Sequence, residues 1–187
     1  MTIAGVVLAA GSSSRLGQPK QLVPCNGEPL LRAIARKVRL ATDATCVVLG
    51  ASKGDIRPSL RGLDIDVVEC ASWREGMAAS LRAGLGWASS GNHEAIVICA
   101  CDQPALDSSH VATLIAVHHA TRSIVASGYA GTAGVPALFP RAWFPRLAEL
   151  EGDRGARLLL DEATVVDWPP GALDLDTPDA LDAYLMR

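Results

Sequence analysis

Short apolar runs alternate along this chain with longer segments in which apolar residues recur every three or four positions. The apolar runs predict strands, at Ile3–Leu8, Cys46–Gly50, Ile65–Glu69, Ala95–Cys101, Ser123–Ala126, Pro136–Phe139 and Thr164–Asp167. The periodic segments predict helices, at Pro29–Leu40, Met77–Ala88, Asp107–His118 and Asp179–Met186. Several predicted strands are almost continuously apolar, which is typical of strands that helices cover on both faces.

This alternation predicts one α/β domain over residues 1–187. Strands joined by helices form βαβ units, so we expect a Rossmann-like three-layer sandwich with a mostly parallel sheet. The chain of 187 residues is close to the ~150 residues of an average domain, and it contains no internal repeat, low-complexity run or long linker. In such sheets ligands bind beyond the carboxyl ends of the strands, so the residues that follow each strand are candidates for chemistry.

Charge and hydropathy narrow the classes of protein that fit the sequence. The chain has 17 Lys and Arg residues against 20 Asp and Glu residues, a formal net charge of −3. A nucleic-acid-binding domain is usually basic, so we expect no nucleic-acid partner, although a small phosphate ligand needs only a few well-placed cations. No apolar run approaches the ~20 residues that a membrane span requires, so we expect no membrane contact.

The five cysteines are expected to be free thiols in a reduced, cytoplasmic protein. They form no CxxC pair, and several lie inside apolar runs, where cysteine packs as a small hydrophobe. Cys99 and Cys101 are two residues apart on a predicted strand, so both side chains should enter the core on one face. The apolar start of the chain, Met1–Gly11, lacks the basic region of a signal peptide and predicts a buried first strand.

The loop after the first predicted strand offers a cradle for phosphate. Residues 9–14 are Ala, Gly and Ser, whose small side chains let a ligand approach the backbone and leave N–H groups for anionic oxygens. Arg15 and Lys20 add two cations to the same loop. Neither the GxxxxGK(S/T) pattern of a P-loop nor a GxGxxG fingerprint is present. Taken alone, the loop would be interpreted first as a flexible surface turn with two solvated charges.

Motifs along most of the chain add to this interpretation. Residues 8–31, LAAGSSSRLGQPKQLVPCNGEPLL, resemble the signature of the molybdenum cofactor cytidylyltransferase family, which is roughly LAAGxSxRMGxxKxLLPxxGxPLL. Further blocks of the family follow in order: WREGMAASLRAGL at 73–85, DQP at 102–104, GVPALF at 134–139, LEGDRGAR at 150–157 and DLDTP at 174–178. Leu16 replaces a usual methionine and Val23 a usual leucine, both apolar exchanges. The resemblance implies the nucleotide-diphospho-sugar transferase fold.

The resemblance also implies a reaction, the transfer of CMP from CTP to the phosphate of molybdopterin with release of pyrophosphate. Such chemistry relies on positioning and charge neutralisation, because the attacking phosphate is already an anion and needs no general base. Carried onto this sequence, the catalytic residues are Lys20 on the triphosphate, Arg15 on the leaving pyrophosphate and Asp102, which holds Mg²⁺. Asp176 is the expected second metal ligand, with Asp174 as the alternative. Without the other motifs, Asp102 before Gln-Pro would be read as a turn former.

The nucleotide itself is expected to contact small residues, and one of them bears on the choice of base. The nucleotide-binding residues implied by the resemblance are Leu8, Ala9, Ala10, Gly11, Ser12, Lys20, Gly76 and Ser80. We expect CTP over GTP, because guanylyltransferase relatives usually carry glycine where Ala10 stands and a methyl group leaves less room for a purine. The alternatives are a related transferase that uses GTP or another phosphorylated acceptor, and a non-catalytic molybdopterin-binding accessory protein. Transient contact with molybdoenzymes or their chaperones is also implied.

The histidines and tryptophans are not expected to carry the chemistry. His93, His110, His118 and His119 show no metal-ligand spacing with the cysteines, so we expect them on helix surfaces. The tryptophans are expected to be packing residues. Trp73 lies beside one of the motif blocks and is therefore a candidate for the border of the site.

Overall fold

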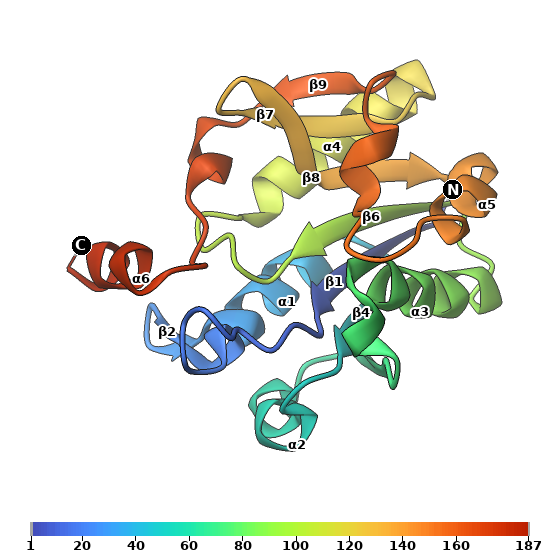
Figure 1. The fold of residues 1–187 in the computed structure, drawn as a ribbon. Coiled ribbons are helices and arrows are strands. Elements are labelled where there is room, and N and C mark those ends of the chain that lie inside the picture. Colours follow the sequence, from blue (N-terminus) through green and yellow to red (C-terminus); the bar gives the residue numbers. More distant parts are fainter. Residues whose placement is uncertain (1, 187) are drawn as a thin grey trace.

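The core of the computed structural model is a seven-stranded sheet (Figure 1). The structure describes residues 2–186. Residues 1 and 187 of the predicted 1–187 domain lie outside the described residues. The strands are β1 (Ile3–Ala9), β4 (Ala44–Leu49), β5 (Asp66–Glu69), β6 (Ala95–Ala100), β7 (Val125–Tyr129), β8 (Thr132–Pro140) and β9 (Thr164–Asp167). Their order is β5-β4-β1-β6-β8-β7-β9, and β8 runs antiparallel to both of its neighbours while the other pairs are parallel. The predicted α/β fold with a mostly parallel sheet is confirmed.

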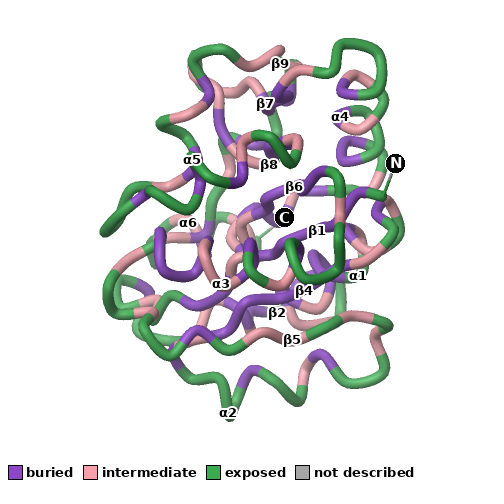
Figure 2. Tube along the Cα trace, turned by 90° about the vertical axis from the view of Figure 1, so that its right-hand side faces the viewer, coloured by how far each residue is buried: buried purple, intermediate pink, exposed green. Residues whose placement is uncertain are grey.

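Helices cover both faces of this sheet. The described helices are α1 (Leu30–Ala41), α2 (Lys53–Ile56), α3 (Met77–Ser90), α4 (Ser108–Thr121), α5 (Phe144–Ala148) and α6 (Pro178–Leu185). α1 and α4 pack against each other on one face, and α3 and α5 pack on the opposite face (Figure 1). Along β1 the side chains alternate between the two layers, Val7 joining the α1 and α4 side and Val6 the α3 side. The inner strands β1, β4 and β6 are therefore buried between two apolar layers, whereas the edge strands β5 and β9 are partly exposed (Figure 2).

Shorter elements connect these layers. Short 3₁₀ helices lie at η1 (Lys20–Leu22), η2 (Arg57–Leu60), η3 (Trp73–Glu75), η4 (Arg141–Trp143), η5 (Ala156–Leu159) and η6 (Pro169–Ala172). A small two-stranded sheet of β2 (Pro24–Cys25) and β3 (Glu28–Pro29) leads from the first loop into α1. No helix of residues 2–186 has the length and apolar character needed to cross a bilayer.

The β7–β8 hairpin is longer than the predicted strands Ser123–Ala126 and Pro136–Phe139. It extends through small residues to a turn at Ala130 and Gly131, both of which have positive φ. The sequence between the two predicted strands is rich in Gly, Ala and Ser, which favours loops, so the extension is missing from the prediction. The hairpin matters for function because it overhangs the carboxyl ends of the parallel strands (Figure 1).

Two histidines of α4 lie in the interior, so the expectation that they are surface residues is wrong. His110 is 7% exposed, its Nε2 atom lies 2.7 Å from Ser127 Oγ, and its ring stacks on Trp168. His118 is 2% exposed, and its Nδ1 atom lies 2.7 Å from the carbonyl oxygen of Ser123. Both rings face the sheet because they fall on the same side of α4 as Val111 and Leu114. A hydrogen bond to each ring offsets the cost of burying it.

The cysteines pack as expected. All five are free and buried. Cys99 and Cys101 both belong to the apolar layer beneath α1 and α4, as their spacing predicts. Burial raises the pKa of both thiols to about 12, so they remain protonated and unreactive.

Candidate active site

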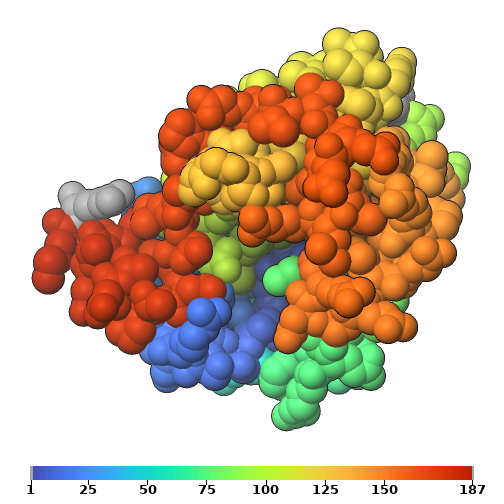
Figure 3. Space-filling view, turned by 45° about the horizontal axis from the view of Figure 1, so that its top comes forward, coloured from blue at the N-terminus to red at the C-terminus, as the bar shows by residue number. Residues whose placement is uncertain are grey.

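A cavity of about 630 Å³ opens at the carboxyl ends of β1 and β6. Its lining includes every residue predicted to bind nucleotide, together with Asp102: Leu8, Ala9, Ala10, Gly11, Ser12, Lys20, Gly76 and Ser80. Figure 3 shows the hollow between the first loop in blue, the C-terminal segment in red and the segment around residue 150 in orange. Arg15 and Asp176 do not line the cavity itself and are connected to it through Lys20.

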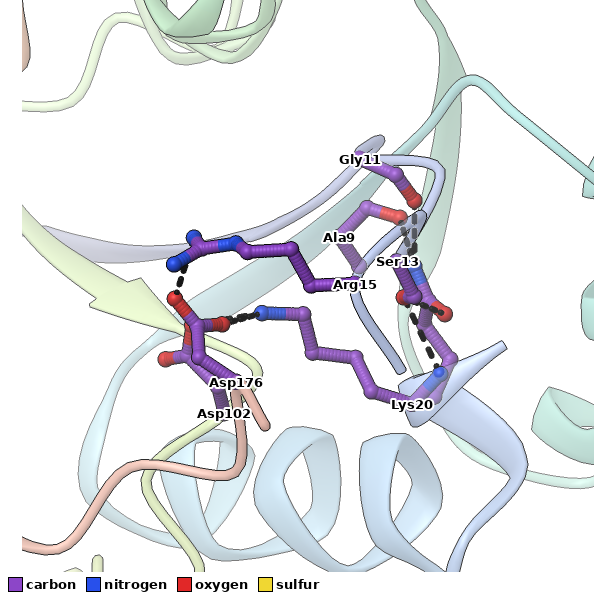
Figure 4. Close-up of polar contacts among 8 residues, drawn as sticks. Ala9, Gly11, Ser13, Arg15, Lys20, Asp102 and Asp176 are labelled. Carbon is purple, nitrogen blue, oxygen red and sulfur yellow. Dashed lines mark hydrogen bonds and ion pairs between the residues drawn. The ribbon is translucent and has the colours of Figure 1, made fainter. Parts of the chain in front are cut away.

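The first loop is held in shape by a residue that sequence reasoning missed. Gln21 is 1% exposed, and its Nε2 atom donates to the carbonyl oxygens of Ala9 at 2.9 Å and Gly11 at 3.0 Å. The hydroxyl of Ser13 accepts from the backbone N–H of Lys20 at 3.1 Å, which closes the loop from the other side (Figure 4). The loop is therefore a braced structure, which disfavours the flexible surface turn. In the sequence, only the apolar neighbours Leu22 and Val23 indicate that the side chain of Gln21 is buried.

Lys20 brings together two acids that are far apart in the sequence. Its Nζ atom donates to Asp102 Oδ2 at 2.9 Å and also to Asp176 Oδ1 (Figure 4). Arg15 donates from Nη2 to the other oxygen of Asp176 at 2.9 Å. The Lys20 side chain is 13% exposed and that of Arg15 is 72% exposed. The three residues proposed as catalytic and the proposed second metal ligand thus form one charged network.

The titration behaviour of this network follows from its contacts. Burial alone would lower the pKa of Lys20, but the charge of Asp102 and the hydrogen bond to Asp176 outweigh it and hold the pKa above its usual value. Burial would raise the pKa of Asp176, but Lys20 and Arg15 lower it on balance. The pKa of Asp174 is raised by partial desolvation of its carboxylate and by the charges of Asp176 and Asp102. Asp174 is exposed and Asp176 contacts Lys20, so the geometry favours Asp176 as the partner of Asp102.

The N-terminal end of α3 forms the opposite wall. Gly76 has φ +107° and ψ −174°, and a Cβ atom there would lie 2.4 Å from the carbonyl group of Gly152. That carbonyl accepts from the backbone N–H of Ala78 at 3.0 Å. The position therefore requires glycine, which lets the loop around Gly152 close onto the helix. Ser80 follows one turn later, 6% exposed, with its side chain part of the cavity wall.

Further residues line the cavity. Trp73 borders it, as expected from the sequence, and Met77 and Asp153 line it without having been predicted. The guanidinium of Arg74 lies 4.5 Å from the centre of the Trp73 ring. Asp153 belongs to the LEGDRGAR block, and that motif is the feature of the sequence that could have identified it as a site residue.

The donor set at the cavity suits a hard divalent cation. Asp102 and Asp176 bring carboxylate oxygens to the same ammonium group, and Mg²⁺ and Mn²⁺ prefer oxygen ligands. Within residues 2–186, no group of three or more His, Cys, Asp or Glu side chains forms a complete metal site. Substrate phosphates would therefore supply the remaining ligands, as they commonly do for Mg²⁺.

Comparison with known proteins agrees with the fold. The chain is 31% identical to the purine catabolism protein PucB of Bacillus subtilis (strain 168), over 95% of this chain and 93% of that protein. It is 40% identical to the molybdenum cofactor guanylyltransferase of Rhodobacter capsulatus, but over only 62% of this chain and 59% of that protein. Among solved structures, Rv0371C of Mycobacterium tuberculosis H37Rv in complex with manganese is 32% identical, with a TM-score of 0.80 and coverage of 100% of this chain and 99% of that one.

The family model described as the MobA-like NTP transferase domain matches residues 5–166, which contain the first loop, Gly76, Ser80 and Asp102. The matched span does not include Asp176, although the fold brings Asp176 into contact with Lys20. The cavity at the strand ends, the braced loop and the match over most of the length place this chain in the family of MobA-like NTP transferase domains.

Proposed function

We propose that this protein transfers a nucleotidyl group from a nucleoside triphosphate to the phosphate of molybdopterin. A phosphate oxygen of the acceptor bonds to the α-phosphorus while the bond from that phosphorus to the oxygen bridging the β-phosphate breaks, and pyrophosphate leaves. The observation that carries the proposal is the convergence of Lys20, Asp102 and Asp176 at a cavity lined by small residues. This arrangement supplies charge and position, which are what phosphoryl chemistry of this type needs.

Each residue of the network has a separate part in this proposal. The first loop, braced by Gln21, presents backbone groups to the triphosphate, and Lys20 neutralises its charge at the buried end of the cavity. Arg15, which is mostly exposed, meets the pyrophosphate as it leaves. Asp102 and Asp176 would hold a divalent cation, which when bound neutralises phosphate charge and stabilises the transition state as a Lewis acid. The manganese complex of the related structure supports a divalent cation.

The acceptor and the base are supported by the names of relatives. The guanylyltransferase of Rhodobacter capsulatus is named for the molybdenum cofactor and for the guanylyl group. That name favours GTP, which we propose as the nucleotide in place of the expected CTP. Ala10 lines the cavity but is only 4% exposed and belongs to the apolar layer beneath α3, which is where its methyl group packs. The steric argument for CTP is weakened accordingly.

The test is pyrophosphate release by the purified protein with GTP or CTP at equal concentration, with and without molybdopterin. We expect release that depends on molybdopterin and a higher kcat/KM for GTP. A preference for CTP would overturn the choice of base and leave the transfer reaction standing. If neither nucleotide gives release in a protein that still binds molybdopterin, the proposed enzymatic activity is overturned. The protein would then be a carrier of that cofactor.

A further inference from the structure

A buried side-chain amide joins three segments directly behind the two acids. Gln103 follows Asp102 at the end of β6 and is 3% exposed. Its Nε2 atom donates to the carbonyl oxygens of Val135 at 3.0 Å and Gly171 at 3.3 Å, and it lies 3.3 Å from the hydroxyl of Tyr129. These partners belong to β8, η6 and β7 in turn. Removing a buried hydrogen-bond donor leaves its acceptors unsatisfied, which makes this junction costly to disturb.

The contact with Gly171 fixes the segment that carries the second acid. The chain leaves η6 at Ala172 and reaches Asp176 within a few residues. On the way, the backbone N–H of Leu175 donates to the carbonyl oxygen of Asp102 at 3.0 Å. Asp102 and Gln103 therefore hold this segment at two points, one through the main chain and one through the amide side chain.

Close packing around Gly171 makes this second point specific. A Cβ atom at Gly171 would lie 2.4 Å from the Trp168 ring and 2.6 Å from the Tyr129 ring. The absence of a side chain lets η6 approach both rings and present its carbonyl oxygen to Gln103. The hydroxyl of Tyr129 donates to the carbonyl oxygen of Val135 at 2.9 Å, which ties β7 to β8 beside the junction.

The spacing set by this junction matters because Asp102 and Asp176 are like charges that share one cation, Lys20. Their mutual repulsion tends to move the η6 segment away from β6. Mg²⁺ requires near-ideal geometry from its oxygen ligands, so a small displacement weakens its binding. Partners behind metal ligands that hold them in place commonly change metal affinity 10- to 100-fold when they are replaced.

We propose that Gln103 is a positioning residue whose buried amide sets the spacing of Asp102 and Asp176, and thereby the affinity of the protein–nucleotide complex for a divalent cation. This inference rests on the proposed function only for the metal and the nucleotide. It does not depend on the acceptor or on turnover, so it can be tested without either.

The experiment uses the full chain and compares the Kd of GTP, with CTP in parallel, in Mn²⁺ and in EDTA by calorimetry. Gln103→Met keeps the length and volume of the side chain and removes the donor. We expect wild-type protein to bind nucleotide more tightly in Mn²⁺. We expect the Kd of the variant for nucleotide in Mn²⁺ to rise about tenfold, while its Kd in EDTA is unchanged.

Ser127→Ala is the matched control. The buried Ser127 hydroxyl donates to the carbonyl oxygen of Pro136 at 2.7 Å and lies 2.7 Å from His110 Nε2, so its removal costs two buried hydrogen bonds, neither of which is made to η6. This control should lower stability and leave the metal-dependent affinity unchanged. If Gln103→Met does not fold, Gln103→Asn tests the same contact, because a chain shorter by one methylene loses reach to Gly171.

Several results would overturn the inference. One is a folded Gln103 variant that keeps the full metal-dependent gain in affinity. Another is an equal loss in Ser127→Ala, which would reduce Gln103 to an ordinary structural contact. A third is wild-type protein that binds both nucleotides equally well in Mn²⁺ and EDTA. A protein that passes this test and fails to transfer nucleotide to molybdopterin would overturn the proposed function alone.

Discussion

Lys20 contacts two acids of the protein itself. Asp102 and Asp176 satisfy its ammonium group, and Asp176 also holds Arg15 close to the cavity although that side chain is 72% exposed. An unrestrained Arg or Lys side chain loses about 2 kcal/mol of rotamer entropy when it is fixed. The acids therefore prearrange the cations, and part of that cost is met before the triphosphate binds. Single substitutions within this network should have large effects on turnover and small effects on the fold.

Asp102→Asn should lower turnover on the order of 10²–10³-fold, because it removes a charge at the point where transition-state charge must be stabilised. Steady-state pyrophosphate release measures this effect, and circular dichroism checks the fold. Asp174→Asn is the matched comparison, since Asp174 is also a carboxylate at this edge but is exposed and does not contact Lys20. Near-wild-type turnover in a folded Asp102→Asn variant, or an equal loss in Asp174→Asn, would contradict the role given to Asp102.

Lys20→Ala should weaken nucleotide binding and slow transfer together, because a phosphate clamp acts in the ground state and the transition state alike. Lys20→Arg should restore only part of the loss, since a planar fork does not replace a compact ammonium group between two carboxylates. Kd and kcat measured for both variants check the prediction. Lys53→Ala, which removes an exposed lysine paired with Glu69, should behave as wild type. Unchanged Kd and kcat in Lys20→Ala would return the loop to a mere surface turn.

At the scale of elements, α4 meets the sheet through polar contacts as well as apolar ones. Asp107 caps the helix by accepting from the backbone N–H of His110 at 2.8 Å, and the His110 ring lies between Trp168 and Ser127. Burial lowers the pKa of His110 below its usual 6.5, although the nearby charge of Asp107 opposes the shift. The helix is therefore docked with a neutral imidazole.

Acidification should destabilise the protein through this residue. Below the unfolded pKa of about 6.5 the unfolded chain binds a proton that the folded chain resists, so stability is full above that pH and is lost as pH falls through the folded pKa. Urea unfolding from about pH 7.5 to about pH 5.5 should show a steeper loss for wild type than for His110→Gln, which keeps a polar side chain and does not titrate. Parallel curves for the two proteins would contradict the prediction.

The elements differ in how well the sequence predicts them. The parallel strands and the long helices are predicted because their apolar periodicity is local, and α4 begins one residue after the predicted Asp107 because that residue caps it. The β7–β8 extension is missed, since its small residues form a strand only through pairing with each other. Gln21 and Gln103 are missed for a related reason. Their partners are carbonyl oxygens of other segments, up to 68 residues away for Gln103, and no sequence pattern marks a carbonyl.

For the whole molecule, one sheet and two apolar layers connect the site to the core. β1 and β6 are the central strands, and the residues that follow them form the cavity. The residues in contact at the site therefore extend from the first loop to the segment before α6. Ligand binding should stabilise the entire fold instead of one region.

Saturating nucleotide with Mn²⁺ should raise Tm by about 5–10 °C. A ligand at 100 times its Kd adds about 2.7 kcal/mol, and each kcal/mol moves Tm by about 2–4 °C in a protein of this size. Thermal unfolding with and without nucleotide measures the shift. Lys20→Ala should lose most of it at the same ligand concentration. A full shift in that variant would show that the stabilising ligand binds elsewhere.

The separation of Lys20, Asp102 and Asp176 along the chain also bears on how the protein is made. The ribosome releases the first loop early. Arg15 and Lys20 therefore leave the ribosome long before their acidic partners have been synthesised. Asp176, which contacts both cations, follows Lys20 by more than 150 residues. A nascent chain of which only β1, β4 and β6 have emerged is still an incomplete domain, and domains generally fold as units. It cannot assemble the charged network until residue 176 has emerged, so incomplete translation products should be unable to consume nucleotide.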